Sequence, residues 1–361
     1  MPLFLSRRKL LTKREKPINS MIKTARKKAT RKGVKSSRVA LGLFVLGFLI
    51  LLIAVGKTIS LIGGLSKPHS PDTLAITRDY SWDGQANLTI AIQSDKTYVF
   101  SLNPSQNMAV ILKVADNTHL TVPFNFGRWA AGSIYQLGQS ESPKIGAKLL
   151  KESVAGALGV PVDGYFILSG SLAQKPFEEI VKTLRQNPLA DLTFLGQAKT
   201  DLSISEYWRM VWVLRSLRYD KITVLDLGQS TLTSWQLLAD GTRVLSFNQP
   251  KLDQFIQKYF ENSKITDEAL SVGILNSTSH PGLAEKAARI VANLGGRVTF
   301  TANYPDTLKN SIVLGKDSYS TAYFSKLFAP HPSKMKIDLD LSRADINIFL
   351  GEDYFLRYNS R

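Results

Sequence analysis

The chain has 361 residues, of which 44% are hydrophobic, and its formal net charge is +17 at pH 7. This length is enough for two ordinary domains in addition to a membrane anchor. Cysteine is absent, which excludes disulfides, thiolate metal sites and a cysteine nucleophile.

The positive charge is concentrated at the N-terminus. Residues 1–38 carry 14 lysines and arginines and one acid, Glu15, whereas the rest of the chain carries 32 basic and 28 acidic side chains. A basic tail of this kind either binds nucleic acid or lies beside a membrane, where positive charge stays on the cytoplasmic side and attracts anionic lipid. The segment that follows the tail decides between these two interpretations.

Residues 39–56, VALGLFVLGFLILLIAVG, form an uncharged apolar run. About 20 such residues cross a bilayer, and residues 57–65 extend the run, so we predict a transmembrane signal anchor over 39–65. A buried core helix would have a polar face, and a cleaved signal peptide would have a shorter apolar stretch and a shorter leader. We therefore predict a single-pass protein of the cell membrane with a cytoplasmic tail that contacts anionic lipid, extracytoplasmic C-terminal domains and no nucleic-acid partner.

Beyond the anchor we predict a polar stalk over 66–86 and a mixed α/β domain over 87–262. Runs of β-forming residues between turn-forming residues predict strands at 88–93, 97–102, 108–114, 165–168, 222–227, 233–238 and 243–247. Apolar residues at helical spacing predict helices at 144–158, 176–184, 207–217 and 252–260. The polar residues 262–264 are interpreted as a linker.

A small α/β sandwich is predicted over 266–354. It has expected strands at 270–275, 297–302, 311–314 and 344–350, and expected helices at 282–294 and 319–328. Strand–helix–strand units of this kind favour right-handed parallel crossovers. In the first helix Leu283, Ala287, Ile290, Val291 and Leu294 are expected to face inward. Glycines 295 and 296 are expected to end that helix.

The C-terminal unit resembles the C-terminal domain of LytR–CpsA–Psr cell-envelope proteins. The resemblance rests on VGILNSTSHPGLA at 272–284, on the Leu-Gly-Gly that ends the following helix, and on ADINIFLGED at 344–353. Residues 87–262 resemble a reduced catalytic domain of the same family. The similar segments are NLTIAIQSD at 87–95, FSLNP at 100–104, AVILKVADNTHLTVP at 109–123 and GVPVDGYF at 159–166.

The resemblance implies a class of surface enzymes that move glycopolymers from a polyprenyl pyrophosphate carrier onto peptidoglycan. Arginines and a divalent ion would then neutralise the pyrophosphate. At the positions of the family's Arg-Asp pair this chain has Asp116 and Asn117. Asp95 and Arg128 are weak catalytic candidates, and we predict no metal site and no cofactor.

Other candidate residues have structural explanations beside the functional ones. Asn276, Ser277 and Gly282 precede a helix, where free N–H groups bind an anion or are capped. Trp208 and Trp212 lie four residues apart on a predicted helix, and packing in a core or an interface is favoured over stacking on carbohydrate. The four histidines are scattered, which is typical of surface positions.

The sequence therefore predicts a non-catalytic, membrane-anchored envelope protein that binds peptidoglycan, a wall glycopolymer or an envelope partner. One alternative is a divergent glycopolymer–peptidoglycan transferase that acts on polyprenyl-pyrophosphate-linked glycan. The other is a purely structural scaffold.

Overall fold

The computed structural model describes residues 41, 43–48, 67–71, 81–229, 231–238, 241–331 and 343–359. The chain divides into two compact units, 1–62 and 63–361, and each is described by itself. In the first unit, Leu41 and residues 43–48 are helical and exposed. Among the described residues, no helix is long and apolar enough to cross a membrane. The basic tail and most of the predicted anchor lie outside the described residues, so both stay predictions.

A seven-stranded sheet forms the centre of the larger unit. Its strands, in spatial order, are β1 (Pro68–Ser70), β8 (Ala198–Ser203), β7 (Gly164–Leu168), β2 (Leu88–Gln93), β3 (Thr97–Asn103), β4 (Met108–Val114) and β9 (Ile222–Asp226). Strands β2, β3 and β4 form an antiparallel meander, and β7 and β9 flank it in parallel. Strands β8 and β1 are antiparallel to their neighbours.

Helices and two small hairpins surround this sheet. The helices are α2 (Ala131–Gln139), α3 (Gly146–Leu158), α4 (Phe177–Gln186), α5 (Ala190–Gln197), α6 (Ile204–Ser216) and α7 (Gln249–Phe260), with short 3-10 turns at Gly170–Leu172 and Tyr219–Lys221. The hairpins pair β5 (His119–Val122) with β6 (Gly127–Ala130), and β10 (Thr233–Leu237) with β11 (Arg243–Phe247).

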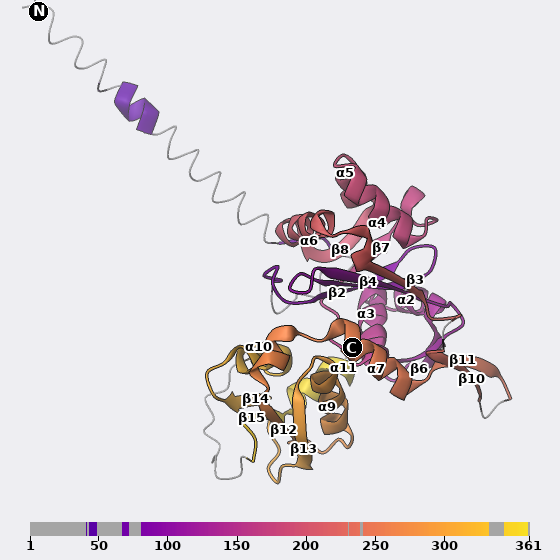
Figure 1. The fold of residues 1–361 in the computed structure, drawn as a ribbon, viewed down its shortest axis with the longest axis vertical. Coiled ribbons are helices and arrows are strands. Elements are labelled where there is room, and N and C mark those ends of the chain that lie inside the picture. The colour runs from indigo at the N-terminus through magenta and orange to yellow at the C-terminus, as the bar shows by residue number, and fades with distance from the viewer. Residues whose placement is uncertain are drawn as a thin grey trace, which may run out of the picture. The chain divides into compact units, whose positions relative to one another are not determined.

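Both faces of the sheet are buried, because successive side chains of a strand point to opposite faces. In β3, Val99 packs in a cluster with α2, α3 and α7. Its neighbours Tyr98 and Phe100 pack in a second cluster with α4, α5 and α6. The sheet therefore separates α4, α5 and α6 from α3 (Figure 1).

The C-terminal region, 263–359, has its own sheet and core. The sheet order is β13 (Arg297–Asn303), β12 (Ser271–Asn276), β15 (Ile346–Leu350) and β14 (Ile312–Gly315). The helices are α8 (Ser263–Glu268), α9 (Leu283–Asn293), α10 (Tyr319–Phe328) and α11 (Glu352–Asn359). Buried side chains of β12, β15, α9, α10 and α11 form one hydrophobic cluster.

One of the two predicted parallel crossovers in this region is wrong. Strand β12 is parallel to β13 across α9, as predicted, but β14 and β15 are antiparallel. The connection from α10 to β15 covers 329–345 and is long enough to bring the chain back to either end of the sheet. Strand β15 enters in the direction of β12, with which it pairs in parallel.

The predicted strands and helices correspond to strands and helices of the structure, with bounds that differ by a few residues. The helix predicted at 319–328 is α10 with the same bounds. The elements that the sequence did not predict are short or polar. They are β1, β5, β6, β8, α2, α5, α8 and α11.

Two predicted connecting segments belong instead to the folded unit. Part of the stalk is strand β1, and Trp82 is buried in the cluster under α6. Residues 262–264 are not a linker, because Asn262 caps α8 by accepting a hydrogen bond from the backbone N–H of Lys264. The Asn262 side chain also donates to the hydroxyl of Tyr319 at 2.9 Å.

Two isoleucines of the C-terminal region differ in how deeply they are buried. Ile274 in β12 is fully buried, whereas Ile290 in α9 packs against the same hydrophobic cluster but is only partly buried. We expect Ile274→Ala to lower the free energy of unfolding by about 2–5 kcal/mol and Ile290→Ala by about 1–2 kcal/mol. Chemical denaturation of the full-length protein in detergent measures both. Equal losses would contradict this assignment of the α9 faces.

Candidate functional site

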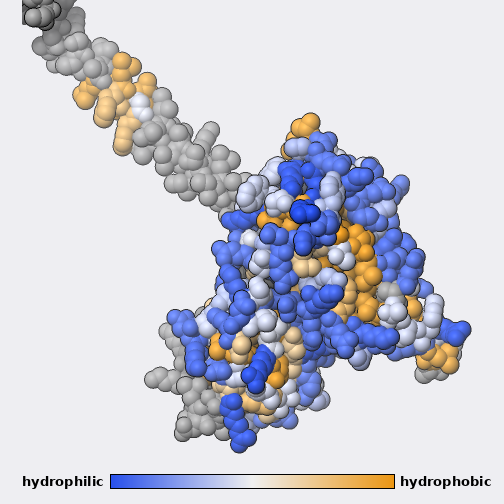
Figure 2. Space-filling view, in the orientation of Figure 1, coloured by the Kyte–Doolittle hydropathy of each residue, from blue (hydrophilic) through white to orange (hydrophobic). Residues whose placement is uncertain are grey.

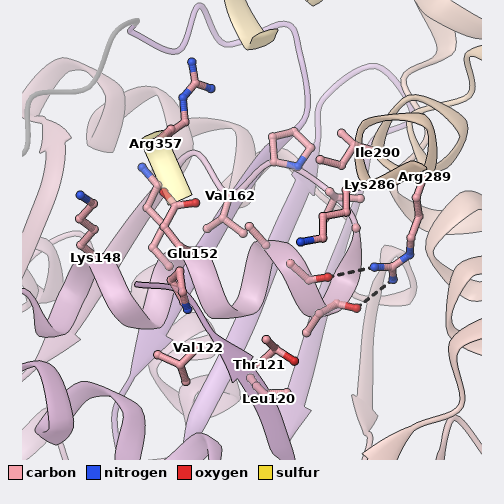
Figure 3. A pocket seen from close by; sticks show the side chains of 18 of the residues that line it. Leu120, Thr121, Val122, Lys148, Glu152, Val162, Lys286, Arg289, Ile290 and Arg357 are labelled. Atoms are coloured by element: carbon pink, nitrogen blue, oxygen red, sulfur yellow. Dashed lines mark hydrogen bonds between the residues drawn. The ribbon is translucent and has the colours of Figure 1, made fainter. Parts of the chain in front are cut away.

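A cleft of about 920 Å³ lies between the region built on the seven-stranded sheet, which we call the first region, and the C-terminal region. On one side it is lined by β5, α3 and the segment that leads into β7. On the other side it is lined by α9, α10 and α11. Figure 3 shows side chains from both regions pointing into this cleft.

The back of the cleft is held by two side chains of α9 that bind the C-terminal end of α3. The Arg289 guanidinium donates to the carbonyl oxygens of Gly156 and Ala157, each at 2.9 Å (Figure 3). The Asn293 amide donates to the carbonyls of Leu158 and Gly159, at 3.2 and 3.1 Å. The last carbonyls of a helix have no partner within the helix, and a cation at this end also interacts favourably with the helix dipole.

Gly159 is required where these two helices meet. Its backbone is left-handed, with φ of 64°, which ends α3. A Cβ atom at this position would lie 2.6 Å from the Arg289 guanidinium carbon and 2.8 Å from the Asn293 amide nitrogen. A larger residue would therefore disturb both the turn and the contact with α9.

Arg289 also ties the C-terminal region to α7. Its Nη2 atom lies 2.8 Å from Oδ1 of Asp253, and its Nε atom lies 3.0 Å from the same oxygen. One guanidinium group thus bridges three helices, α3, α7 and α9. This arrangement fixes the width of the cleft between α3 and α9.

The cleft is strongly basic. Seven basic side chains line it against two carboxylic acids, Glu152 and Asp163. The basic residues are Arg128, Lys148, Lys151, Lys286, Arg289, Lys326 and Arg357. An excess of one sign of charge in a cleft with low-dielectric walls concentrates the potential and attracts ligands of the opposite sign.

Some of these cations have partners within the chain. Lys151 lies 3.6 Å from the carboxylate of Asp201, and Arg357 donates to the carbonyl of Leu327 at 2.8 Å. Lys148, Lys286 and Lys326 form no ion pair with any residue that the structure describes. Figure 3 shows Lys148 and Lys286 on opposite sides of the cleft.

Burial acts on two of the ionisable groups in the cleft. It lowers the pKa of Lys148, which lies over the ring of Phe124 at 4.4 Å. It raises the pKa of Glu152 although Lys151, Arg357 and Lys148 oppose this shift. Burial therefore disfavours the charged forms of both side chains, and a bound anion would oppose this effect at Lys148.

Apolar side chains form the walls between the charges. Leu120 and Val122 come from β5, Val160 and Val162 precede β7, and Ile290 comes from α9. In Figure 3, Val162 and Val122 lie between the basic groups on the two sides. The site combines anion-binding groups with apolar contact surface, which suits a ligand that carries both kinds of group.

The structure does not bring the two weak catalytic candidates into one cavity. Arg128 lines the cleft and donates to the hydroxyl of Ser246 at 2.7 Å. Asp95 is exposed in the turn between β2 and β3 and accepts hydrogen bonds from Ser94 and Tyr98. It is not among the residues that line the cleft. Asp116 and Asn117 are exposed in the turn after β4.

The predicted capping role of Asn276 and Ser277 is wrong. The N-cap residue of α9 is Gly282, with φ of 81° and no side-chain cap. The Asn276 side chain instead closes its own loop, because it donates to the carbonyl of His280 and accepts from Thr278. As binding residues, Asn276, Ser277 and Gly282 stay predictions.

Trp208 and Trp212 are exposed on α6, so the predicted packing in a core is wrong for this pair. Packing at an interface stays a prediction.

The sequence did not predict the basic residues of the cleft as a site, because they come from β6, α3, α9, α10 and α11 and form no local motif. Groups of at least three potential metal ligands are absent from the described part of the chain.

The comparisons with known proteins place the C-terminal region. Residues 269–354 match the family described as "LytR cell envelope-related transcriptional attenuator". This match confirms the resemblance to LytR–CpsA–Psr proteins that the sequence predicted. No curated protein matches the chain significantly.

Several solved structures are similar at low identity. TagT of Bacillus subtilis is 13% identical over 52% of this chain and 96% of its own, with a TM-score of 0.35. TagU of the same organism is 12% identical over 49% and 98%, also with a TM-score of 0.35. A transcriptional regulator of Enterococcus faecalis is 11% identical over 50% and 90%, with a TM-score of 0.38.

The bridge through Arg289 generates a stability prediction. Arg289→Ala removes hydrogen bonds to a carboxylate and to two helix-end carbonyls, so we expect the free energy of unfolding to fall by about 1.5–3 kcal/mol. Arg297→Ala changes an exposed arginine of β13 in the same region and should cost no more than about 0.5 kcal/mol. Chemical denaturation of the full-length protein compares the two. A loss no larger than that of the control would show that the bridge does not hold the regions together.

Proposed function

We propose that the chain, whose residues 269–354 match the LytR cell envelope-related family, is a membrane-anchored envelope protein that binds an anionic wall glycopolymer. The polymer lies in the cleft between the two regions. The N-terminal span holds the protein at the outer side of the cell membrane, and the basic tail lies against anionic lipid on the cytoplasmic side.

The observation that carries this proposal is the charge of the cleft. Seven basic side chains line it, and three of them, Lys148, Lys286 and Lys326, have no ion-pair partner among the described residues. Lysine and arginine bind phosphate groups through strong, charge-assisted hydrogen bonds. A polymer with repeated phosphates can contact several of these cations at once.

The apolar walls of the cleft support a glycopolymer rather than a free anion. Ile290, Leu327 and Phe247 line the cleft and are only partly buried, so they offer contact surface that a sulfate or phosphate ion leaves unfilled. The carbon-bound hydrogens of a sugar or polyol unit pack on such side chains while the phosphates reach the lysines. A volume of about 920 Å³ holds a ligand of several such units.

The proposed role is binding without transfer. Asp116 and Asn117 occupy the positions of the family's Arg-Asp pair, and Asp95 is not among the residues that line the cleft. Arg128 is the one catalytic candidate that reaches the cleft. Attachment of glycan to peptidoglycan by the purified protein, with polyprenyl-pyrophosphate-linked glycan as donor, would favour the transferase alternative instead.

Removing the three lysines without ion-pair partners tests the proposed binding. We expect Lys148→Gln, Lys286→Gln and Lys326→Gln, combined in one variant, to weaken binding of poly(glycerol phosphate) by about 10- to 100-fold. This corresponds to about 0.5–1 kcal/mol for each partly exposed charge. Titration calorimetry with the full-length protein at low and high salt measures the affinity, and its salt dependence should decrease in the variant.

The matched control changes three exposed lysines that do not line the cleft, Lys182, Lys221 and Lys309, to glutamine. It has the same net charge as the test variant, so a general effect of charge would weaken both equally. Equal affinities of the two variants would contradict the location of the site. Absence of polymer binding by the unchanged protein would contradict the proposed function itself.

The raised pKa of Glu152 predicts a pH dependence of the same binding. As pH falls through a raised carboxyl pKa, the side chain takes up a proton and its repulsion of an anionic ligand is lost. Binding should therefore tighten from about pH 7 to about pH 5. Glu152→Gln should bind more tightly at pH 7 and show a smaller pH dependence.

Glu179→Gln, a change of an exposed acid on α4, is the control and should leave the pH profile unchanged. A profile that Glu152→Gln leaves unaltered would mean that this carboxyl does not face the bound anion.

A further inference from the structure

Two neighbouring helices carry large apolar side chains that face solvent. Leu189 and Leu192, at the start of α5, are 73% and 67% exposed, and Trp208 and Trp212 of α6 are 44% and 76% exposed. We refer to these four side chains as the α5–α6 surface. Figure 2 shows hydrophobic side chains at the tip of the molecule where Figure 1 places α5.

The two helices form one rigid layer. The rings of Phe194 in α5 and Tyr207 in α6 are stacked with centroids 5.6 Å apart. The buried Asp191 of α5 accepts a hydrogen bond from the Tyr207 hydroxyl at 3.2 Å. It also forms an ion pair with Arg215 of α6 at 2.7 Å. The exposed side chains are therefore held on a fixed scaffold, which favours a surface used for contact.

This layer lies beside β1, the first described strand after the predicted anchor. The predicted span ends at residue 65, and β1 begins at Pro68. Two intervening residues extend over at most about 10 Å including their junctions. Strand β1 pairs with β8, the strand that connects α5 to α6, and the His69 Nε2 atom lies 3.3 Å from the carbonyl of Leu195 in α5.

We propose that the α5–α6 surface rests on the outer face of the lipid bilayer, with the tryptophan rings at the headgroup level and the leucines in the upper acyl region. Tryptophan is enriched at membrane interfaces because its ring is apolar while its N–H is polar, and leucine adds apolar area. This inference rests on the membrane anchor of the proposed function.

The bilayer is the partner that the predicted anchor brings next to this surface. An anchor two residues away keeps lipid at a high effective concentration next to α5 and α6, so a modest contact is sufficient. Basic side chains beside the surface suit anionic headgroups, because Lys199 and Arg209 are both exposed next to it.

The placement determines the orientation of the cleft. Helices α4, α5 and α6 cover one face of the seven-stranded sheet, and α3, which lines the cleft, covers the other. With the α5–α6 surface on lipid, the cleft opens on the side of the sheet away from the membrane. A wall polymer then reaches it without crossing the headgroup layer.

Fluorescence quenching by lipid tests the contact. The full-length protein is reconstituted into vesicles of phosphatidylcholine and phosphatidylglycerol whose acyl chains carry bromine at a shallow position. The chain has five tryptophans. We expect the bromolipid to quench the unchanged protein, and we expect most of this quenching to be lost in the double variant Trp208→Phe and Trp212→Phe.

The control variant combines Trp129→Phe and Trp235→Phe, which are 40% and 60% exposed elsewhere on the surface, and it should retain the quenching. Equal quenching in both variants would overturn the proposal. So would protection of Trp208 and Trp212 from aqueous acrylamide that depends on protein concentration and not on lipid, because a second copy would then cover the surface.

The same vesicles separate this inference from the function on which it rests. Failure of the protein to float with the vesicles would contradict the anchor. Flotation with normal binding of poly(glycerol phosphate) but without tryptophan quenching would overturn the membrane contact alone.

Discussion

The position of the C-terminal region against the larger sheet depends on how the carbonyl groups at the end of α3 are satisfied. Four carbonyls at this helix end accept hydrogen bonds from Arg289 and Asn293 of α9, a helix that lies more than 120 residues later in the chain. Because the same arginine pairs with Asp253 of α7, three helices share one polar junction. A cleft with fixed walls follows from this junction, since α3 and α9 cannot separate without exposing buried polar groups.

The cleft retains charges that the fold does not need. Lys148 is partly desolvated, and this burial lowers its pKa. Glu152 is surrounded by three cations and nevertheless has a raised pKa. Groups whose environments oppose their charged forms are typical of functional sites, where a ligand provides the missing partner. In the polar junction that closes the back of the cleft, the Arg289 guanidinium and the Asn293 amide both find acceptors within the chain.

Local patterns predicted the regular elements well because their apolar residues repeat at the period of the element. Helix α10 is an example, with Tyr323, Phe324 and Phe328 on its packed side. Strand β8, Ala-Lys-Thr-Asp-Leu-Ser, escaped prediction because only Ala198 and Leu202 of its residues are hydrophobic, while its buried polar residues lie between two paired strands. Helix α2 contains two glycines, which weaken the helical pattern.

The candidate site was beyond prediction for a related reason. Its lysines and arginines come from five separate elements, so no spacing in the sequence connects them. Trp208 and Trp212 have the spacing of a packed helix face, and that spacing is the same whether the face meets a core, a partner or lipid. The spacing of apolar residues indicates that a helix face is apolar, whereas the tertiary structure shows what that face contacts.

Strand β1 also protects the sheet to which it belongs. An unpaired edge strand offers free N–H and C=O groups on which another chain can grow as an added strand. Three residues of β1 cover that edge of β8. A soluble fragment trimmed to begin at the first long strand would lose this cover and leave β8 as an open template, so shortening the chain for solubility would promote aggregation. The three residues of β1 therefore protect this edge against pairing with another chain.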